Sequence, residues 1–114
     1  MNKVWFITRH DPTADQLRLA PGLIKVPDIN GFDRSAVNAL LREANAADVD
    51  HIIVVNAAMA LNIATLAIER EQFMYIGIFE NAARAAEGAK PTFEAKTLHW
   101  WVVEYSAEGW TLSY

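Results

Sequence analysis

The chain of 114 residues contains no cysteine. It can therefore form no disulfide framework and supply no thiolate for catalysis. It also lacks any run of roughly 20 apolar residues, the length that crosses a bilayer. Its first residues, Met1-Asn2-Lys3, lead into a short apolar stretch without a cleavage site. We therefore expect a cytoplasmic protein with neither a signal peptide nor a membrane span.

Positive charge is also scarce, since the formal net charge is −4. Binding of long nucleic acids needs a basic surface, so we do not expect it. A small phosphate ligand can still be bound, because one or two well-placed arginines suffice for a local site. No G-x-G-x-x-G loop follows the first apolar run, and the three histidines lack a metal-ligand spacing. We predict neither a cofactor nor a metal.

Hydrophobic residues make up 53% of the sequence, enough for one globular domain over residues 1–114. Apolar runs predict strands and amphipathic patterns predict helices, in alternation. The expected strands are 3–8, 23–27, 51–55, 73–79, 97–105 and 110–114, and the expected helices 12–20, 34–46 and 57–71. This order predicts a Rossmann-like α/β fold, a mostly parallel sheet flanked by helices with a C-terminal antiparallel hairpin. The segment 80–96 has no clear periodicity, and it is predicted to loosen at Gly88 and Pro91 into a flexible loop over 87–96.

Two apolar features allow more than one interpretation. The helix expected at 57–71 is apolar on nearly every side, which indicates burial either in its own core or against a second copy of the chain. The C-terminal aromatic residues are interpreted as cross-strand packing, although such rings can also stack on bases. These residues are Trp100, Trp101, Tyr105, Trp110 and Tyr114. His51 and His99 are interpreted as structural.

The candidate functional site begins at Thr8-Arg9-His10, where the first apolar run stops. In open parallel sheets, ligands bind at the carboxyl ends of the strands. A hydroxyl, a permanent cation and an imidazole at that position suit an anionic ligand that carries phosphate. Thr13 and Gln16, in the turn that follows, are further candidates.

Polar residues also follow two later strands. Asn56 follows the third strand, and Glu80 and Asn81 follow the fourth, with Arg84 one turn later if the chain is helical there. Together with the first group they predict one crevice that holds two arginines and a histidine, with backbone donors from helix N-termini. The alternative is that these polar residues only stabilise turns, as His10 beside Asp11 would do.

One short motif resembles a known enzyme family. Arg9-His10-x-x-Thr13, after an apolar strand, resembles the Arg-His-Gly-x-Thr signature of the histidine phosphatases, with Asp11 in place of the glycine. In that family the histidine accepts the phosphoryl group. The resemblance implies that His10 is a nucleophile.

A second resemblance covers most of the chain. The sequence has a strand that ends in Arg9-His10, the helix start Thr13-Ala14-Asp15-Gln16, an apolar helix after the third strand, an expected polar turn with a basic residue over 79–84 and a closing hairpin. This order of features resembles that of small CRISPR-associated proteins. Those proteins are stand-alone CARF domains, which are dimeric Rossmann-like modules that bind cyclic oligoadenylates. Several are ring nucleases, which degrade this second messenger and switch off type III CRISPR defence.

This second resemblance implies a homodimer that cleaves cyclic oligoadenylate without a metal. Arg9, assisted by Arg84, would stabilise the charge on phosphorus, and His10 would be the general acid or base. The ligand-binding residues would be Thr8, Thr13, Gln16, Asn56, Glu80 and Asn81. The alternative is a sensor or partner module that binds the same ligand without turnover.

Overall fold

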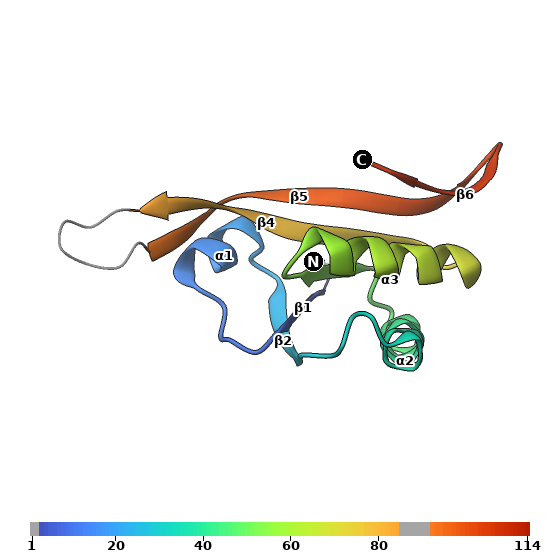
Figure 1. Cartoon of the computed structure of the whole chain (residues 1–114), viewed down its shortest axis with the longest axis horizontal. Helices are drawn as coiled ribbons and strands as arrows, with labels where there is room; N and C mark the ends of the chain where they lie inside the picture. The colour runs from blue at the N-terminus through green and yellow to red at the C-terminus, as the bar shows by residue number, and fades with distance from the viewer. Residues whose placement is uncertain (1–2, 85–91) are drawn as a thin grey trace.

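The structure is a computed structural model that describes residues 3–84 and 92–114. Strands and helices alternate along the first two thirds of the chain, and strands alone follow (Figure 1). The elements are β1 (Val4–Thr8), α1 (Ala14–Leu19), β2 (Leu23–Pro27), α2 (Arg34–Ala46), β3 (His51–Val54), α3 (Ala57–Glu69), β4 (Met74–Arg84), β5 (Thr92–Ser106) and β6 (Gly109–Ser113).

All six strands of the described chain form one sheet in the order β2-β1-β3-β4-β5-β6. The first four are parallel neighbours, whereas β5 and β6 join antiparallel. The predicted α/β class is confirmed, with a mostly parallel sheet, flanking helices and an antiparallel C-terminal hairpin. Because the chain steps from β1 to β2 and then back past β1 to β3, the crossovers place helices on both faces.

Most of the core lies between the sheet and the pair α2 and α3. Its fully buried side chains include Ile7, Leu41, Ile52, Ile63 and Met74. A smaller cluster around Phe6, Ala20 and Ile53 lies on the other face, with the short helix α1. The sheet is thus covered more completely on one face than on the other.

Side-chain caps fix where each helix begins. The Asp33 carboxylate accepts hydrogen bonds from the backbone of Ser35 and Ala36 at the start of α2, as its N-cap position predicts. At α1 the cap is Thr13, so Pro12 precedes the helix instead of opening it. The predicted helix over 12–20 is therefore shorter than expected.

Helix α3 buries six of its apolar side chains inside its own domain, namely Met59, Ala60, Ile63, Ala64, Leu66 and Ala67. The outward positions carry small or polar side chains except at Leu61, which is 50% exposed. The helix ends at Glu69, before the expected residue 71, since Glu71 has a left-handed φ of 53° that ends a helix. Burial in its own core explains most of its apolar sequence, and the homodimer stays a prediction.

Within the described residues, no helix combines the length and the hydrophobicity that a membrane crossing requires.

The expected loop over 87–96 is wrong where the structure describes it, since residues 92–96 belong to β5. Strand β4 continues to Arg84 and β5 begins at Thr92, with Asn81 opposite Ala95 after a register shift. The expected polar turn over 79–84 and the helical placement of Arg84 are wrong for the same reason. Alanine, asparagine and glutamate are poor strand formers, but each segment supplies backbone partners to the other. The remainder of the predicted loop, 87–91, lies outside the described residues.

The C-terminal aromatic residues divide into two groups. Trp100, Trp101 and Trp110 are half-buried in the sheet packing, which confirms the interpretation for these three. Trp100 lies so close to Gly77 that a Cβ at this glycine would fall 2.9 Å from its ring. Tyr105 and Tyr114 are instead 72% and 80% exposed.

Candidate functional site

A crevice opens at the carboxyl ends of β1, β2 and β3, and we call it the strand-end crevice. It consists of three adjoining hollows that share Arg9 and Asp28, the largest with a volume of about 540 Å³. The chain leaves β1 toward one face of the sheet and β3 toward the other, so the crevice lies where ligands bind in open α/β sheets. Its lining residues are Thr8, Arg9, His10, Lys25, Pro27, Asp28, Ile29, Asn30, Gly31, Phe32, Val55, Asn56 and Met59.

Arg9 brings positive charge to all three hollows. Its Nε donates a hydrogen bond of 2.9 Å to Oδ2 of Asp28, just after β2. The Arg9 side chain is 81% exposed, and this pairing uses only one edge of the guanidinium. Its remaining N–H donors stay available for paired contacts with the oxygens of a phosphate.

Thr8 and His10 stand on either side of this arginine. Thr8 is 4% exposed, and its hydroxyl accepts a hydrogen bond of 3.2 Å from the backbone N–H of His10. This contact sets the turn that leaves β1. The His10 ring is exposed at the rim and has no hydrogen bond to another described residue. Thr8 thus shapes the turn, while the imidazole of His10 is free to meet a ligand.

Asn56 places the start of α3 at the crevice. Its side-chain oxygen accepts a hydrogen bond of 2.8 Å from the backbone N–H of Met59 and caps the helix. Other N–H groups of the first turn have no partner within the helix and carry the positive end of its dipole. Together with Arg9 they form an environment that suits an anion.

The segment after β2 forms the opposite wall of the crevice. Gly31 is buried against α3, where a Cβ would fall 2.3 Å from Cγ of Met59. The Asn62 side chain of α3 donates a hydrogen bond to the Gly31 carbonyl. Phe32 follows at the rim and is 68% exposed. The wall is therefore fixed to the helix whose N-terminus it faces.

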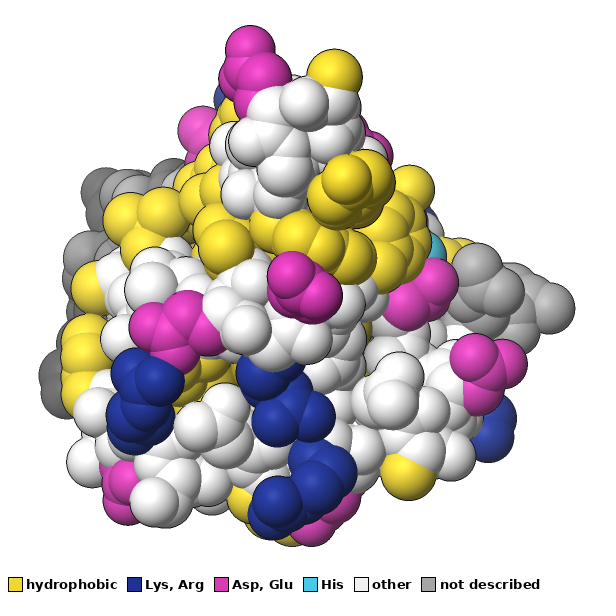
Figure 2. Space-filling model, turned by 90° about the vertical axis from the view of Figure 1, so that its right-hand side faces the viewer, with side chains coloured by type: hydrophobic (Ala, Val, Ile, Leu, Met, Phe, Trp, Pro, Cys, Tyr) yellow, Lys and Arg dark blue, Asp and Glu magenta, His cyan; other side chains and the backbone are white. Residues whose placement is uncertain are grey.

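The charges around the crevice nearly balance. Lys25 of β2 pairs with Asp11 at 3.1 Å, beside the Arg9–Asp28 pair. At the opposite end of the sheet, basic and acidic side chains also lie close together, below a band of hydrophobic side chains (Figure 2). An anion would therefore bind at the free edge of the Arg9 guanidinium, close to the negative charge of Asp28.

Four of the predicted site residues, Thr8, Arg9, His10 and Asn56, lie together in the crevice. Thr13 and Gln16 do not line it, since they form a capping box at α1. The Thr13 hydroxyl accepts from the Gln16 backbone at 3.2 Å, and the Gln16 side chain accepts from the Thr13 backbone at 2.9 Å.

The residues predicted after the fourth strand are not brought to the crevice either. Asn81 belongs to β4 and is exposed there, and the side chain of Arg84 lies outside the described part of the structure. Glu80 accepts hydrogen bonds of 2.7 Å from His99 and 2.9 Å from Thr97 on β5. These two hydrogen bonds, with the charge of a protonated His99, hold the pKa of Glu80 below its ordinary value.

Asp28 is the important crevice residue that the sequence analysis missed. It directly follows the second expected strand, 23–27, and it contacts Arg9 and lines all three hollows of the crevice. The signal that identified Arg9 and Asn56, a polar residue directly after an apolar strand, also applies to Asp28. That strand is an edge strand with exposed residues, so its end is less obvious in the sequence.

The crevice can bind a phosphate and present an imidazole to it. In the described parts of the chain, no three histidine or carboxylate side chains gather in a way that would hold a metal ion. No protein-family model, curated protein or solved structure matches the chain.

Proposed function

We propose that the chain is a homodimeric Rossmann-like domain of the CARF type that binds cyclic oligoadenylate in the strand-end crevice and cleaves it. The observation that carries the proposal is the placement of Arg9, His10 and Asn56 around one crevice at the ends of β1 and β3. A guanidinium, an imidazole and a helix N-terminus are the groups that a phosphodiester requires.

The proposed cleavage uses the ribose of the ligand itself. The 2′-oxygen attacks the adjacent phosphorus and the bond from phosphorus to the 5′-oxygen breaks, which leaves a 2′,3′-cyclic phosphate. The 2′-hydroxyl proton passes to a base, and the departing 5′-oxygen takes up a proton. His10 would perform one of these transfers, and Arg9 would stabilise the charge on the equatorial oxygens.

The size of the crevice supports a ligand shared between two copies. Its largest hollow measures about 540 Å³, which falls within the range of small-molecule sites, about 300–1,000 Å³. A ring of several nucleotides extends beyond one such hollow. A two-fold dimer would offer two equivalent crevices to a ring of matching symmetry.

A second candidate function is binding without turnover, as in a sensor or partner module. It is favoured by the His10 ring, which no hydrogen bond from another described side chain orients. Catalytic imidazoles are usually oriented by a second group. The two functions share the crevice and differ only in the fate of the ligand.

Incubation of the purified protein with labelled cyclic oligoadenylates in the presence of EDTA tests the proposal. We expect a linear product that ends in a 2′,3′-cyclic phosphate. His10→Ala should lower turnover about 100-fold with little change in binding, in line with the usual contribution of general acid–base catalysis. Arg9→Ala should weaken both binding and turnover.

The matched control is Arg18→Ala. Arg18 is also an exposed arginine in an ion pair, with Asp15 at 3.0 Å, but it does not line the crevice, so this variant should behave as wild type. Retained but intact ligand would establish the sensor instead. Release of inorganic phosphate from a phosphomonoester would favour a phosphatase, and absence of any binding would refute both nucleotide functions.

A further inference from the structure

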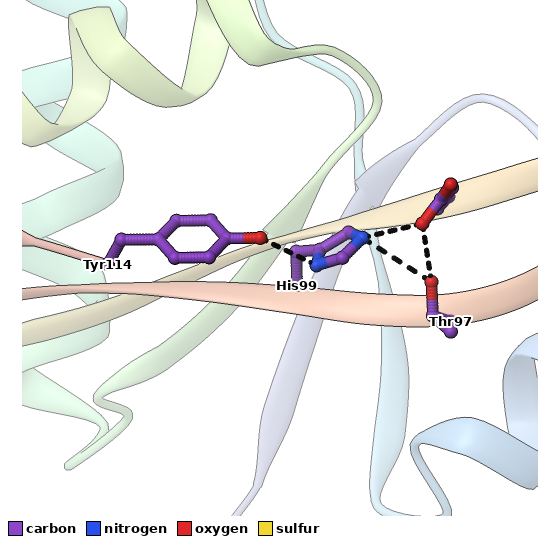
Figure 3. Close-up of polar contacts among 4 residues, drawn as sticks. Thr97, His99 and Tyr114 are labelled. Atoms are coloured by element: carbon purple, nitrogen blue, oxygen red, sulfur yellow. Dashed lines mark hydrogen bonds and ion pairs between the residues drawn. The ribbon is translucent and has the colours of Figure 1, made fainter.

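Four polar side chains form a hydrogen-bonded cluster on β4, β5 and the residue after β6. Tyr114 Oη lies 2.8 Å from Nδ1 of His99, and Nε2 of the same ring lies 2.7 Å from Oε2 of Glu80 (Figure 3). The Thr97 hydroxyl donates to the same carboxylate oxygen at 2.9 Å. β5 is three strands from β1 in the sheet, about 14 Å at the usual strand spacing. None of these four residues lines a hollow of the strand-end crevice, although β4, which carries Glu80, lies next to β3.

The partners of His99 determine which of its nitrogens carries the proton. Hydrogen bonds from His99 and Thr97 hold the pKa of Glu80 below its ordinary value of 4.5, so this carboxylate is ionised at neutral pH and can only accept. Nε2 of His99 must therefore donate to it. In the neutral ring, Nδ1 is then the acceptor, and the hydroxyl of Tyr114 donates its proton to that nitrogen.

Few charged groups surround this imidazole. Glu80 faces it from β4, and Lys96 on β5 acts on Glu80 through its charge. Helix α3, which packs against β5 and β6, has no charged residue between Ala57 and Ile68. Among the side chains that the structure describes, the titratable groups near the imidazole are therefore Glu80, Lys96 and Tyr114 itself.

The chain provides an internal comparison for Tyr114. Tyr105 is exposed to a similar extent, 72% against 80%. Its ring packs edge-on to Trp110, and its hydroxyl has no hydrogen bond to any residue that the structure describes. Of the two exposed phenols, Tyr114 alone lies against a base that a carboxylate holds in place.

We propose that Tyr114 is an activated phenol, a modification site that accepts an acyl group from a neutral acyl donor. A hydroxyl hydrogen-bonded to an imidazole that a carboxylate orients is the arrangement that activates hydroxyl nucleophiles. The Tyr114 oxygen bonds to the carbonyl carbon while its proton moves to Nδ1 of His99. The bond from carbon to the leaving group then breaks, and the leaving group departs with a proton that His99 returns through solvent. A neutral donor is favoured because Glu80 repels an anionic one.

Acetylation of the intact protein with N-acetylimidazole tests this inference. The acetylation of Tyr114 and Tyr105 is measured in the same sample by mass spectrometry of their peptides. Tyr114 should react about 10-fold faster at about pH 7.5, a smaller gain than in a buried site because water competes in an exposed one.

Two variants test whether the fast acetylation of Tyr114 comes from His99 and Glu80 or only from the exposure of its hydroxyl. His99→Gln keeps a polar side chain but removes the base, so the Tyr114 rate should fall to that of Tyr105. Glu80→Gln should lower it about threefold, since Glu80 is a positioning residue that acts through His99. Circular dichroism of each variant shows whether the fold is intact. Equal rates for the two tyrosines in wild type would refute the proposal without any variant.

Discussion

The Arg9–Asp28 ion pair sets how much positive charge the strand-end crevice offers to a ligand. Asp28→Asn keeps an oxygen that can accept from Nε of Arg9 and removes the negative charge. A phosphate about 6 Å from that carboxylate is repelled by about 0.7 kcal/mol in a water-like medium. We therefore expect the variant to bind phosphate ligands about threefold more tightly, measured by titration calorimetry at low ionic strength.

Salt provides the control for this substitution. Because Asp28 acts here through charge, the gain should shrink as the salt concentration rises and the Debye length shortens. Weaker binding in Asp28→Asn at every salt concentration would contradict the prediction. It would show that Asp28 holds Arg9 in place more than it competes with the ligand.

For single residues, the sequence identifies those that lie in the crevice because they follow a strand of the parallel sheet. Arg9, His10 and Asn56 directly follow apolar strands, and strand ends of a parallel sheet meet at one edge. Thr13 and Gln16 stand in the same turn, but the start of α1 uses their polar atoms. Capping and ligand binding call for the same residue types, so the sequence cannot separate these roles.

Residues 28–32, which follow β2 and form one wall of the crevice, can contact α3 because Gly31 has no side chain. In Gly31→Ala the new methyl group would lie 2.3 Å from Cγ and 3.0 Å from Sδ of Met59. Met59 is buried and must shift, which should lower the free energy of unfolding by about 1–3 kcal/mol. Denaturant unfolding followed by circular dichroism measures the change.

A double-mutant cycle with Met59→Ala tests the cause of that loss. Met59→Ala removes the side chain that the methyl group would meet, so adding Gly31→Ala to it should cost little. Additive effects of the two substitutions would mean that the alanine disturbs something other than this contact.

Strands and helices of the parallel half follow from the sequence because their apolar periodicity is long and regular. The continuation of β4 through residues 80–84 and of β5 through residues 92–96 cannot be predicted from the sequence in this way. Asn81, Ala82 and Ala83 have low strand propensity, and their pairing depends on a partner segment that lies elsewhere in the chain. Long-range pairing of this kind leaves little trace in either segment alone.

At the scale of the whole molecule, the proposed second copy would cover exposed apolar side chains at the crevice and on α3. Phe32 and Val55 line the crevice and are 68% and 59% exposed, and Leu61 on α3 is 50% exposed. Exposed apolar side chains close together mark interaction surfaces. We expect a dimer in size-exclusion chromatography with light scattering, and a monomer for Leu61→Lys.

Ile24→Lys is the matched control for the dimer. Ile24 is 45% exposed on the edge strand β2, so the same charge is introduced at a comparable apolar position. This variant should remain dimeric. A wild-type protein that is monomeric at every concentration would contradict the expectation and leave each crevice to act alone.

Strand β4 belongs to both halves of the sheet. One edge of β4 pairs with β3 in the parallel half, β2-β1-β3-β4, and its other edge pairs with β5 in the antiparallel half, β4-β5-β6. Neither half can open along β4 without removing hydrogen-bond partners from the other. We therefore expect the two halves to unfold together, with the amide hydrogens of Tyr75 to Ile78 exchanging with solvent only in that global event, as hydrogen exchange followed by NMR would measure.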